Sequence, residues 1–147
     1  MEQLIFVAVF VTLGYFFGRR AEKKHFKSLI EREEQMNKLP AMASRMPPQD
    51  GEYDQFLVSG NVVIANDYFK TFVAGLRNFF GGKISTYESL LDRARREALL
   101  RMKEEADKLG AELVFNVKYE TSNISGQGSK KPPIIEAHAY GTALKKL

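Results

Sequence analysis

The sequence predicts an α+β domain, a small antiparallel sheet with helices on one face, preceded by a single transmembrane helix. Residues 85–110 carry apolar side chains at steps of three and four, the spacing of an amphipathic helix. Segments of alternating hydrophobicity lie before and after this helix and indicate strands with one buried face. Residues 4–17 contain Thr12 as their single polar side chain, which indicates a membrane span.

Composition limits the classes of protein that this chain can belong to. Its 147 residues, 44% hydrophobic and 27% charged, are typical of one domain plus an appendage. The absence of cysteine excludes disulfides, thiolate metal sites and cysteine nucleophiles. Residues 19–38 hold seven Lys or Arg against four Glu, so much of the net charge of +4 lies beside the apolar N-terminal run. This placement favours a membrane surface over nucleic acid as a partner.

Residues 1–18 are predicted to form the membrane anchor. As a helix they would be about 27 Å long, which is within the accepted range for a ~30 Å hydrocarbon core. A cleaved signal peptide is disfavoured because Glu2 precedes the apolar run and Arg19 and Arg20 follow it. A buried core helix is the other alternative, but no comparable apolar helix follows to pack with it. The predicted anchor residues are Leu4, Ile5, Phe6, Val7, Val9, Phe10, Val11, Leu13, Tyr15, Phe16 and Phe17.

Positive charges set the expected orientation of this anchor. Basic residues follow the run directly, so we expect a single-pass protein with its N-terminus outside and its C-terminal domain in the cytoplasm. The basic residues concerned are Arg19, Arg20, Lys23, Lys24 and Lys27. Gly14 and Gly18 have the GxxxG spacing of close helix pairs, but in so short a run two incidental glycines are the preferred interpretation.

The rest of the chain divides into three parts. Residues 19–39 interleave charged and apolar side chains and predict a charged juxtamembrane helix that Pro40 ends. Residues 40–54 hold three prolines and no apolar period, so we expect an irregular, Pro-rich linker. Residues 55–147 then form the α+β domain.

The first half of this domain is predicted as a strand and two helices. Residues 56–65 alternate as a strand does, and Gly60 in their middle suggests a bulge. A short helix is expected from Asn66 or Asp67 to about Phe80. The main helix follows, with a capping box of Ser85 and Glu88 at its start and Gly110 as its terminator. Its predicted buried face consists of Tyr87, Leu91, Ala94, Ala98, Met102, Ala106 and Leu109.

Two strands and a loop are predicted after the main helix. The first strand places Leu113, Phe115, Val117 and Tyr119 on one face. Residues 122–133 form a loop, and a last strand runs from about residue 134 to 144. In that strand one face carries Ile135, Ala137 and Ala139, and the other carries Glu136, His138 and Tyr140.

A homo-oligomer is expected on physical grounds. A sheet of so few strands, covered on one side, is marginal for a domain of about ninety residues. Its second face is mixed rather than polar, with Leu57, Val63 and Val114 among polar residues. Association with copies of the chain would cover this face and the open strand edges.

Several short motifs resemble those of a known family. They are residues 72–77 (Phe-Val-Ala-Gly-Leu-Arg), Gly81-Gly82, residues 109–111 (Leu-Gly-Ala) and residues 141–143 (Gly-Thr-Ala). Together they resemble the YbjQ-like family of small bacterial and archaeal domains, uncharacterised protein family 0145, over most of residues 56–144. The resemblance implies a dodecin-like subunit, assembly into a ring that is typically a pentamer, and a loose heavy-metal-binding label. The anchor, the linker and the Lys/Pro-rich loop at 129–133 depart from the family form, and the anchor implies a ring tethered to a membrane.

Candidate metal ligands are few. Soft metals prefer thiolates or clustered imidazoles, and this chain has no Cys and two His. His25 is interpreted as a solvated side chain of the juxtamembrane segment. Glu136 and His138 share one strand face and are the candidate ligands, which copies of the chain would repeat around a symmetry axis. An ordinary polar or interface role for His138 is the favoured alternative, and no cofactor is expected.

The predicted function is therefore structural. No nucleophile with a placed base and no GxGxxG or GxxxxGK[ST] motif is present, so no enzymatic activity is predicted. We expect a membrane-anchored, ring-forming domain with a scaffolding or interaction role, whose partners are copies of itself and membrane lipid. A small-ligand or metal-binding module with sites between subunits is the alternative, and an enzyme is kept as the third.

Overall fold

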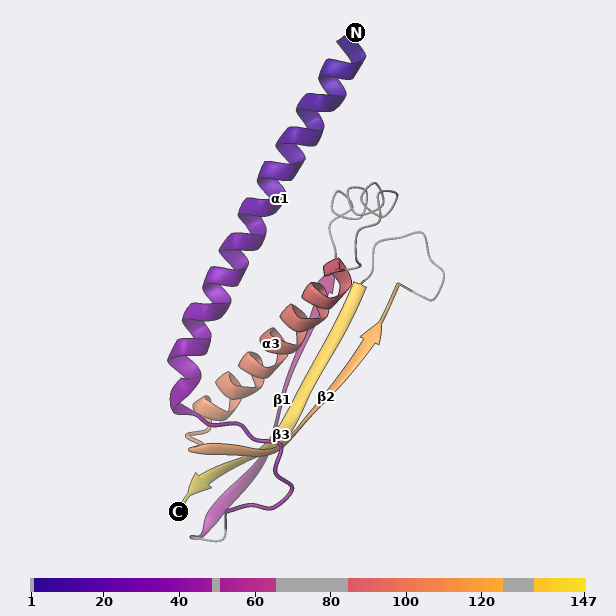
Figure 1. Ribbon diagram of the computed structural model, residues 1–147. Helices are drawn as coiled ribbons and strands as arrows, with labels where there is room; N and C mark the ends of the chain where they lie inside the picture. Colours follow the sequence, from indigo (N-terminus) through magenta and orange to yellow (C-terminus); the bar gives the residue numbers. More distant parts are fainter. Residues whose placement is uncertain (1, 49–50, 66–84, 126–133) are drawn as a thin grey trace.

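The computed structural model describes residues 2–48, 51–65, 85–125 and 134–147. A long helix comes first and is followed by a three-stranded antiparallel sheet with one helix on it (Figure 1). The sheet order is β1-β3-β2, so the last strand lies in the middle. This confirms the predicted small α+β fold. The elements are α1 (Glu2–Gln35), the 3-10 turn η1 (Met36–Lys38), β1 (Tyr53–Ala65), α3 (Ser85–Lys108), β2 (Leu113–Asn123) and β3 (Ile134–Lys146).

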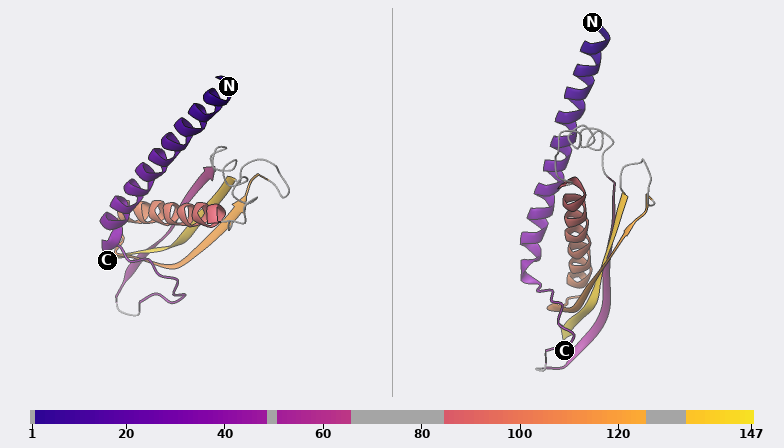
Figure 2. Two further views of the ribbon diagram at one scale, coloured as in Figure 1. Left: turned by 45° about the horizontal axis from the view of Figure 1, so that its top comes forward. Right: turned by 45° about the vertical axis from the view of Figure 1, so that its right-hand side comes forward.

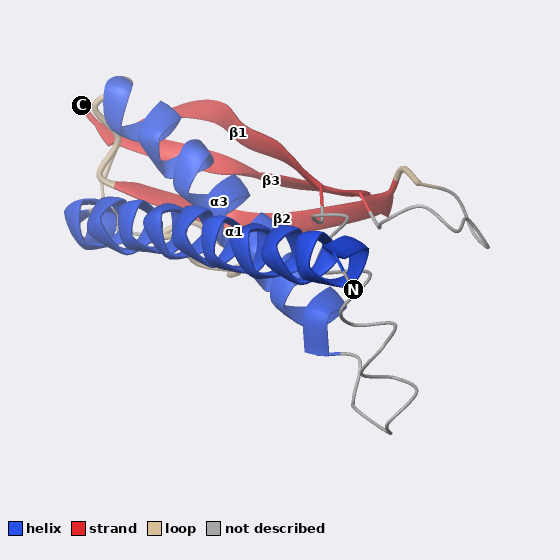
Figure 3. Cartoon of the chain, turned by 90° about the horizontal axis from the view of Figure 1, so that it is seen from above, coloured by secondary structure: helices blue, strands red, loops and turns tan. Residues whose placement is uncertain are grey.

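The core lies between α3 and the inner face of the sheet (Figure 3). Four predicted core residues of α3, namely Ala94, Ala98, Met102 and Ala106, are fully buried. On β3 the predicted alternation is also confirmed, because Ile135, Ala137 and Ala139 are buried while the residues between them are partly exposed. Small residues on both sides let the helix backbone approach the strands closely.

The backbone of α3 lies close against β1 at Gly60, and the predicted bulge there is wrong. The pairing of β1 with β3 runs without a register shift through Gly60 and its partner Ala139. A Cβ at position 60 would lie 2.2 Å from the carbonyl oxygen of Ala98 and 2.5 Å from the backbone nitrogen of Met102. Glycine is therefore needed for packing against the helix backbone.

The predicted end of α3 is confirmed in detail. Gly110 has φ +75°, the left-handed conformation that glycine adopts readily. The Gly110 N–H donates to the carbonyl of Asp107 and the Ala111 N–H to that of Ala106, both at 3.0 Å. These two bonds form a Schellman motif, which satisfies carbonyls that the helix leaves free.

Strand β2 contains a bulge that the alternating pattern did not predict. The register against β3 shifts between Phe115 and Lys118, and Asn116 has φ 53°. The extra residue changes which side chains face inward. Val114 pairs with Ala143 and Tyr119 with Ala139, two inner-face residues of β3, whereas Phe115 pairs with Thr142 of the outer face. Val114 and Val117 both join the core. The prediction that Val117 and Tyr119 share a face with Phe115, and the placement of Val114 on the outer face, are therefore wrong.

Helix α1 combines the predicted anchor and juxtamembrane helix in one continuous element. It ends at Gln35, and η1 continues to Lys38, just before Pro40, as proline requires. Its first part extends away from the rest of the molecule (Figure 2). Within the described part of the chain, no helix is long and apolar enough to cross a membrane.

The segment after Pro40, which was predicted as an irregular linker, is hydrogen-bonded to the sheet. Ala41 forms a parallel bridge with Val114. The Met42 N–H donates to the Val114 carbonyl at 2.9 Å, and the Asn116 N–H donates to the Ser44 carbonyl at 2.8 Å. Residues 40–44 therefore cover the first half of the outer edge of β2, and Leu39 beside them is buried in the core.

Some sequence predictions lie outside the described residues. They concern the short helix near 67–80, the motifs at 72–77 and 81–82, and residues 126–133 of the loop predicted at 122–133. The start of that predicted loop is wrong, because Ser122 and Asn123 belong to β2. The helix start at Ser85 is confirmed, but the Ser85 side chain of the predicted capping box is also outside the description. The same holds for most side chains of the predicted anchor, except Val9, Thr12, Leu13 and Phe16.

Candidate functional site

The outer sheet face, the face turned away from α3, carries a polar hollow. The strand register places His138 of β3 directly between Asn61 of β1 and Glu120 of β2. Two residues before His138 on the same face of β3, Glu136 lies opposite Ser122. The hollow has a volume of about 280 Å³ and is lined by Asn61, Glu120, Thr121, Ser122, Glu136 and His138.

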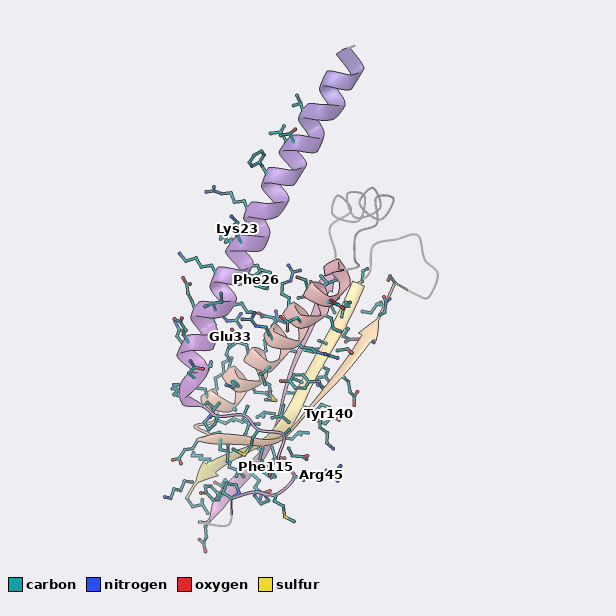
Figure 4. All side chains as sticks on the ribbon, viewed as in Figure 1. Lys23, Phe26, Glu33, Arg45, Phe115 and Tyr140 are labelled. Atoms are coloured by element: carbon teal, nitrogen blue, oxygen red, sulfur yellow. The ribbon has the colours of Figure 1, made fainter. Side chains whose placement is uncertain are left out.

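Hydrogen bonds already engage both carboxylates of this hollow. The Ser122 hydroxyl donates to Glu136 Oε2 at 3.0 Å, and the Tyr140 hydroxyl donates to Glu120 Oε1 at 3.1 Å. The bond to Glu120 raises the pKa of Tyr140, because it stabilises the protonated phenol. The ring of His138 lies 5.4 Å from that of Tyr140, at a tilt of 36° (Figure 4 labels Tyr140). The arrangement can accept hydrogen bonds from a ligand or attract a cation.

The two metal candidates, Glu136 and His138, do share this hollow, and Glu120 joins them. Even so, no group of three or more His, Cys, Asp or Glu side chains in the described ranges is arranged to hold one metal ion. A structural zinc site normally takes four protein ligands, and softer metals prefer sulfur, which this chain lacks. The described residues of one copy therefore do not by themselves form a heavy-metal site.

Apolar side chains lie on the same face as the hollow, on β1. Leu57 is 79% exposed and Val63 is 56% exposed, as the mixed second face predicted. The free edge of β1 is covered near the hollow by α3. The Ser59 N–H donates to Glu105 Oε2 at 2.7 Å, and Arg101 donates to the Asn61 carbonyl at 2.9 Å. Another strand cannot pair with β1 at these two groups unless α3 side chains move away.

A charge cluster joins α1 to the outer side of α3, and sequence reasoning missed it. Arg32 donates to both oxygens of Glu97 at 3.1 Å and to Glu104 at 2.8 Å. Arg96 donates to both oxygens of Glu33, at 2.8 and 2.6 Å. We call these five residues the interhelical charge cluster. Figure 4 shows Glu33 on the part of α1 that lies beside α3.

Ion pairs also lie within α3 itself: Glu97–Arg101 at 2.9 Å and Asp92–Arg96 at 3.9 Å. Glu97 is only 3% exposed, because α1 covers it. Leu100 of α3 and Leu29 of α1 are buried as well, at 2% and 0% exposure. The sequence did contain a signal for this contact. Leu100 is an apolar residue of α3 that does not belong to the predicted buried face of the helix.

The family model and the sequence relatives that match this chain indicate the same family. Residues 51–146 match the family described as "Putative heavy-metal-binding", YbjQ. A UPF0145 protein of Pyrococcus furiosus is 40% identical over 60% of this chain and 72% of its own length. A UPF0145 protein of Archaeoglobus fulgidus is 44% identical over 60% of this chain and 77% of its own length.

Among solved structures, a protein of unknown function from Pediococcus pentosaceus aligns with 73% of this chain and 96% of its own. Its sequence identity is 17% and the TM-score is 0.46. The family match covers well over half of the chain. This chain therefore belongs to the YbjQ-like family, the UPF0145 proteins.

Proposed function

We propose that this protein is a membrane-anchored subunit of a homo-oligomeric ring whose domain, on the cytoplasmic side, acts as a scaffold or interaction module. The observation that carries the proposal is the outer sheet face, where Leu57 and Val63 remain exposed beside a polar hollow. Apolar side chains gathered on one face of a sheet typically mark an interaction site. The edge of β1 is partly covered by α3, which favours contact through the face. Five copies are the number that the family resemblance implies.

The proposed anchor rests on the first part of α1. Residues 4–17 contain one polar side chain, and the described apolar residues Val9, Leu13 and Phe16 are 50%, 48% and 65% exposed. Exposed apolar residues on an extended helix need a partner surface, and the adjoining basic segment favours a bilayer. Deletion of residues 1–18 is expected to move the protein from the membrane pellet to the supernatant. Pelleting of the truncated protein with membranes would remove this part of the proposal.

Light scattering of the full chain in mild detergent tests self-association. We expect an oligomer for the wild type and a shift toward monomer for the Leu57→Asp/Val63→Asp variant, since each charge would be buried in the contact. Met46→Asp is the matched control, because Met46 is 75% exposed but lies outside the sheet. A wild-type monomer, or equal dissociation by the control, would refute the ring.

The alternative function is binding of a small ligand or metal between subunits. The polar hollow favours it, because one copy supplies an imidazole, two carboxylates and an amide without completing a metal site. Donors from a neighbouring copy would complete it. Zinc titration of the oligomer by calorimetry, with His138→Ala for comparison, decides the point. Saturable binding that His138→Ala abolishes would support the alternative, and no binding would leave scaffolding as the function.

A further inference from the structure

The part of α1 that extends away from the rest of the molecule carries two groups of exposed residues on one side of the helix. At ~100° per residue, Val9, Leu13 and Phe16 lie within about 60° of the same line as Arg20, Lys23, Lys24 and Lys27. All seven side chains are exposed. We call the first three the apolar stripe and the last four the basic stripe. Along this line the helix surface changes from apolar to cationic between residues 16 and 20.

The basic stripe faces away from the contact with the domain. Leu29, which is buried, Glu33, which accepts from Arg96 of α3, and Met36 of η1 lie on the opposite side of the helix by the same periodicity. Docking of α1 therefore leaves the basic stripe open. Figure 4 shows Lys23 on the part of α1 that extends beyond the docked turns.

Within the described residues, the basic side chains of this stripe have almost no acidic partners. Lys27 approaches Glu31 at 3.8 Å, an exposed pair of little strength. In the described portion of the structure, no carboxylate pairs with Arg20, Lys23 or Lys24. Three exposed cations on one helix side that have no carboxylate partner among the described residues attract counterions or an anionic partner.

The spacing along the axis matches a lipid headgroup layer. With ~1.5 Å per residue, Arg20, Lys23 and Lys24 begin about 5 Å and end about 10 Å beyond residue 17, the last of the apolar run. The polar layer of a bilayer is about 5–8 Å thick on each side, and long basic side chains can reach back toward it. Lys27, about 15 Å away and next to Glu31, lies at the margin.

We propose that the basic stripe, through Arg20, Lys23 and Lys24, binds anionic phospholipid headgroups at the membrane surface. This inference rests on the membrane anchoring proposed above and adds the class of lipid that the protein selects. The apolar stripe on the same line favours a bilayer over a soluble polyanion, because both stripes can meet one lipid surface at once. Anionic lipid would then gather around the helix and hold the domain at a set distance from the bilayer.

The test uses the full chain reconstituted in phosphatidylcholine vesicles that contain spin-labelled phosphatidylglycerol or spin-labelled phosphatidylcholine. The measured quantity is the enrichment of phosphatidylglycerol over phosphatidylcholine at the protein. One basic residue near an anionic surface raises the binding constant for that surface up to about fivefold. We therefore expect Lys23→Gln/Lys24→Gln to reduce the enrichment at least about threefold, and 1 M salt, with a Debye length of ~3 Å, to reduce it in the wild type.

Lys145→Gln/Lys146→Gln is the matched control. These two lysines are also exposed, and they precede the C-terminus, which lies at the opposite end of the molecule from the start of α1 (Figure 1). Glutamine is a good helix former, so the change on α1 should not disturb the fold. The control is expected to retain the full enrichment.

The outcomes separate the inference from the proposal on which it rests. If the protein floats with pure phosphatidylcholine vesicles and shows no enrichment of phosphatidylglycerol, the inference is overturned and the anchor stays in place. Flotation with neither kind of vesicle would overturn both. Flotation only with vesicles that contain phosphatidylglycerol, lost in Lys23→Gln/Lys24→Gln, would support the basic stripe and overturn the anchor. Equal enrichment in the α1 variant and the wild type would refute the stripe.

Discussion

Arg32 provides the sharpest test of how α1 is held on the domain. Its guanidinium donates to Glu97, which is 3% exposed, and to Glu104. Burial alone would lower the pKa of Arg32, but the hydrogen bonds to Glu104 and Glu97 outweigh it and raise the pKa. Replacement by alanine removes three charge-assisted hydrogen bonds and leaves Glu97 with one remaining cation, Arg101. The two helices should then separate more easily.

The magnitude follows from this geometry. Removal of one partner from a fully buried ion pair costs about 3–5 kcal/mol. The side chains of Arg32 and Glu104 keep 30% and 31% exposure, and Arg101 still neutralises Glu97, so the cost here is smaller. We expect Arg32→Ala to destabilise the docked state by about 2 kcal/mol, and Arg32→Lys, which keeps the charge but loses the fork geometry, by about half as much.

Two measurements check this expectation in the full chain in mild detergent. Urea unfolding reports the loss of global stability, and hydrogen exchange reports the docking of the end of α1. Amides of residues 29–35 should exchange about 30-fold faster, the equivalent of 2 kcal/mol, if undocking is local. Lys27→Ala is the control on the same helix, because the exposed Lys27–Glu31 pair contributes less than about 0.5 kcal/mol. Equal effects of Arg32→Ala and Lys27→Ala in both measurements would refute the role of the charge cluster.

Three further predictions concern packing, backbone conformation and pH. Gly60→Ala should cost about 3 kcal/mol or more in urea unfolding, because its Cβ would overlap the Ala98 carbonyl oxygen. Asn116→Val should cost about 1–2 kcal/mol, because a β-branched residue rarely adopts φ 53°, whereas Asn116→Gly should be nearly neutral. The hydrogen bond from Arg96 lowers the pKa of Glu33 below 4.5, so the stability from this pair is complete above pH 4.5 and lost as pH falls through the lowered pKa.

Each of these predictions has its own control. Ser59→Ala, next to Gly60 but exposed, should change stability by less than about 0.5 kcal/mol, and an equal loss in both would show that the α3 contact is not the cause. A destabilised Asn116→Gly would show that the bulge does not need the left-handed conformation. In Arg96→Gln the acid-dependent part of the α1 docking assigned to Glu33 should disappear, and an unchanged pH profile would assign it to other carboxylates.

Much of the local structure was predictable because periodicity depends on neighbours in the sequence. The buried alanines of α3, the alternation along β3 and the end at Gly110 all follow from rules that act within a few residues. The candidate ligands Glu136 and His138 were placed on one face for the same reason. Which residues of the two neighbouring strands stand directly beside His138 could not be decided from the sequence, since this depends on the register between strands.

The failures concern contacts between distant segments. A bulge at Asn116 changes the face of every residue after it, and nothing in the alternation of β2 marks the position where it occurs. Gly60 was explained by its own strand, whereas its cause is the backbone of α3. The attachment of the residues after Pro40 to β2 was not predicted, because their hydrogen-bond partners lie more than sixty residues further along the chain.

By itself the sequence determined the family, the α+β class, the alternation along β3 and the sheet-facing side of α3, since hydrophobic period and turn residues act locally. The membrane anchor and the ring remain predictions. Only the tertiary structure decided which charges are solvated and which join helices. Glu97 and Arg32 are ordinary surface residues until α1 folds back on α3 and removes water from between them. Burial depends on the whole fold, and so does the energy of a charge.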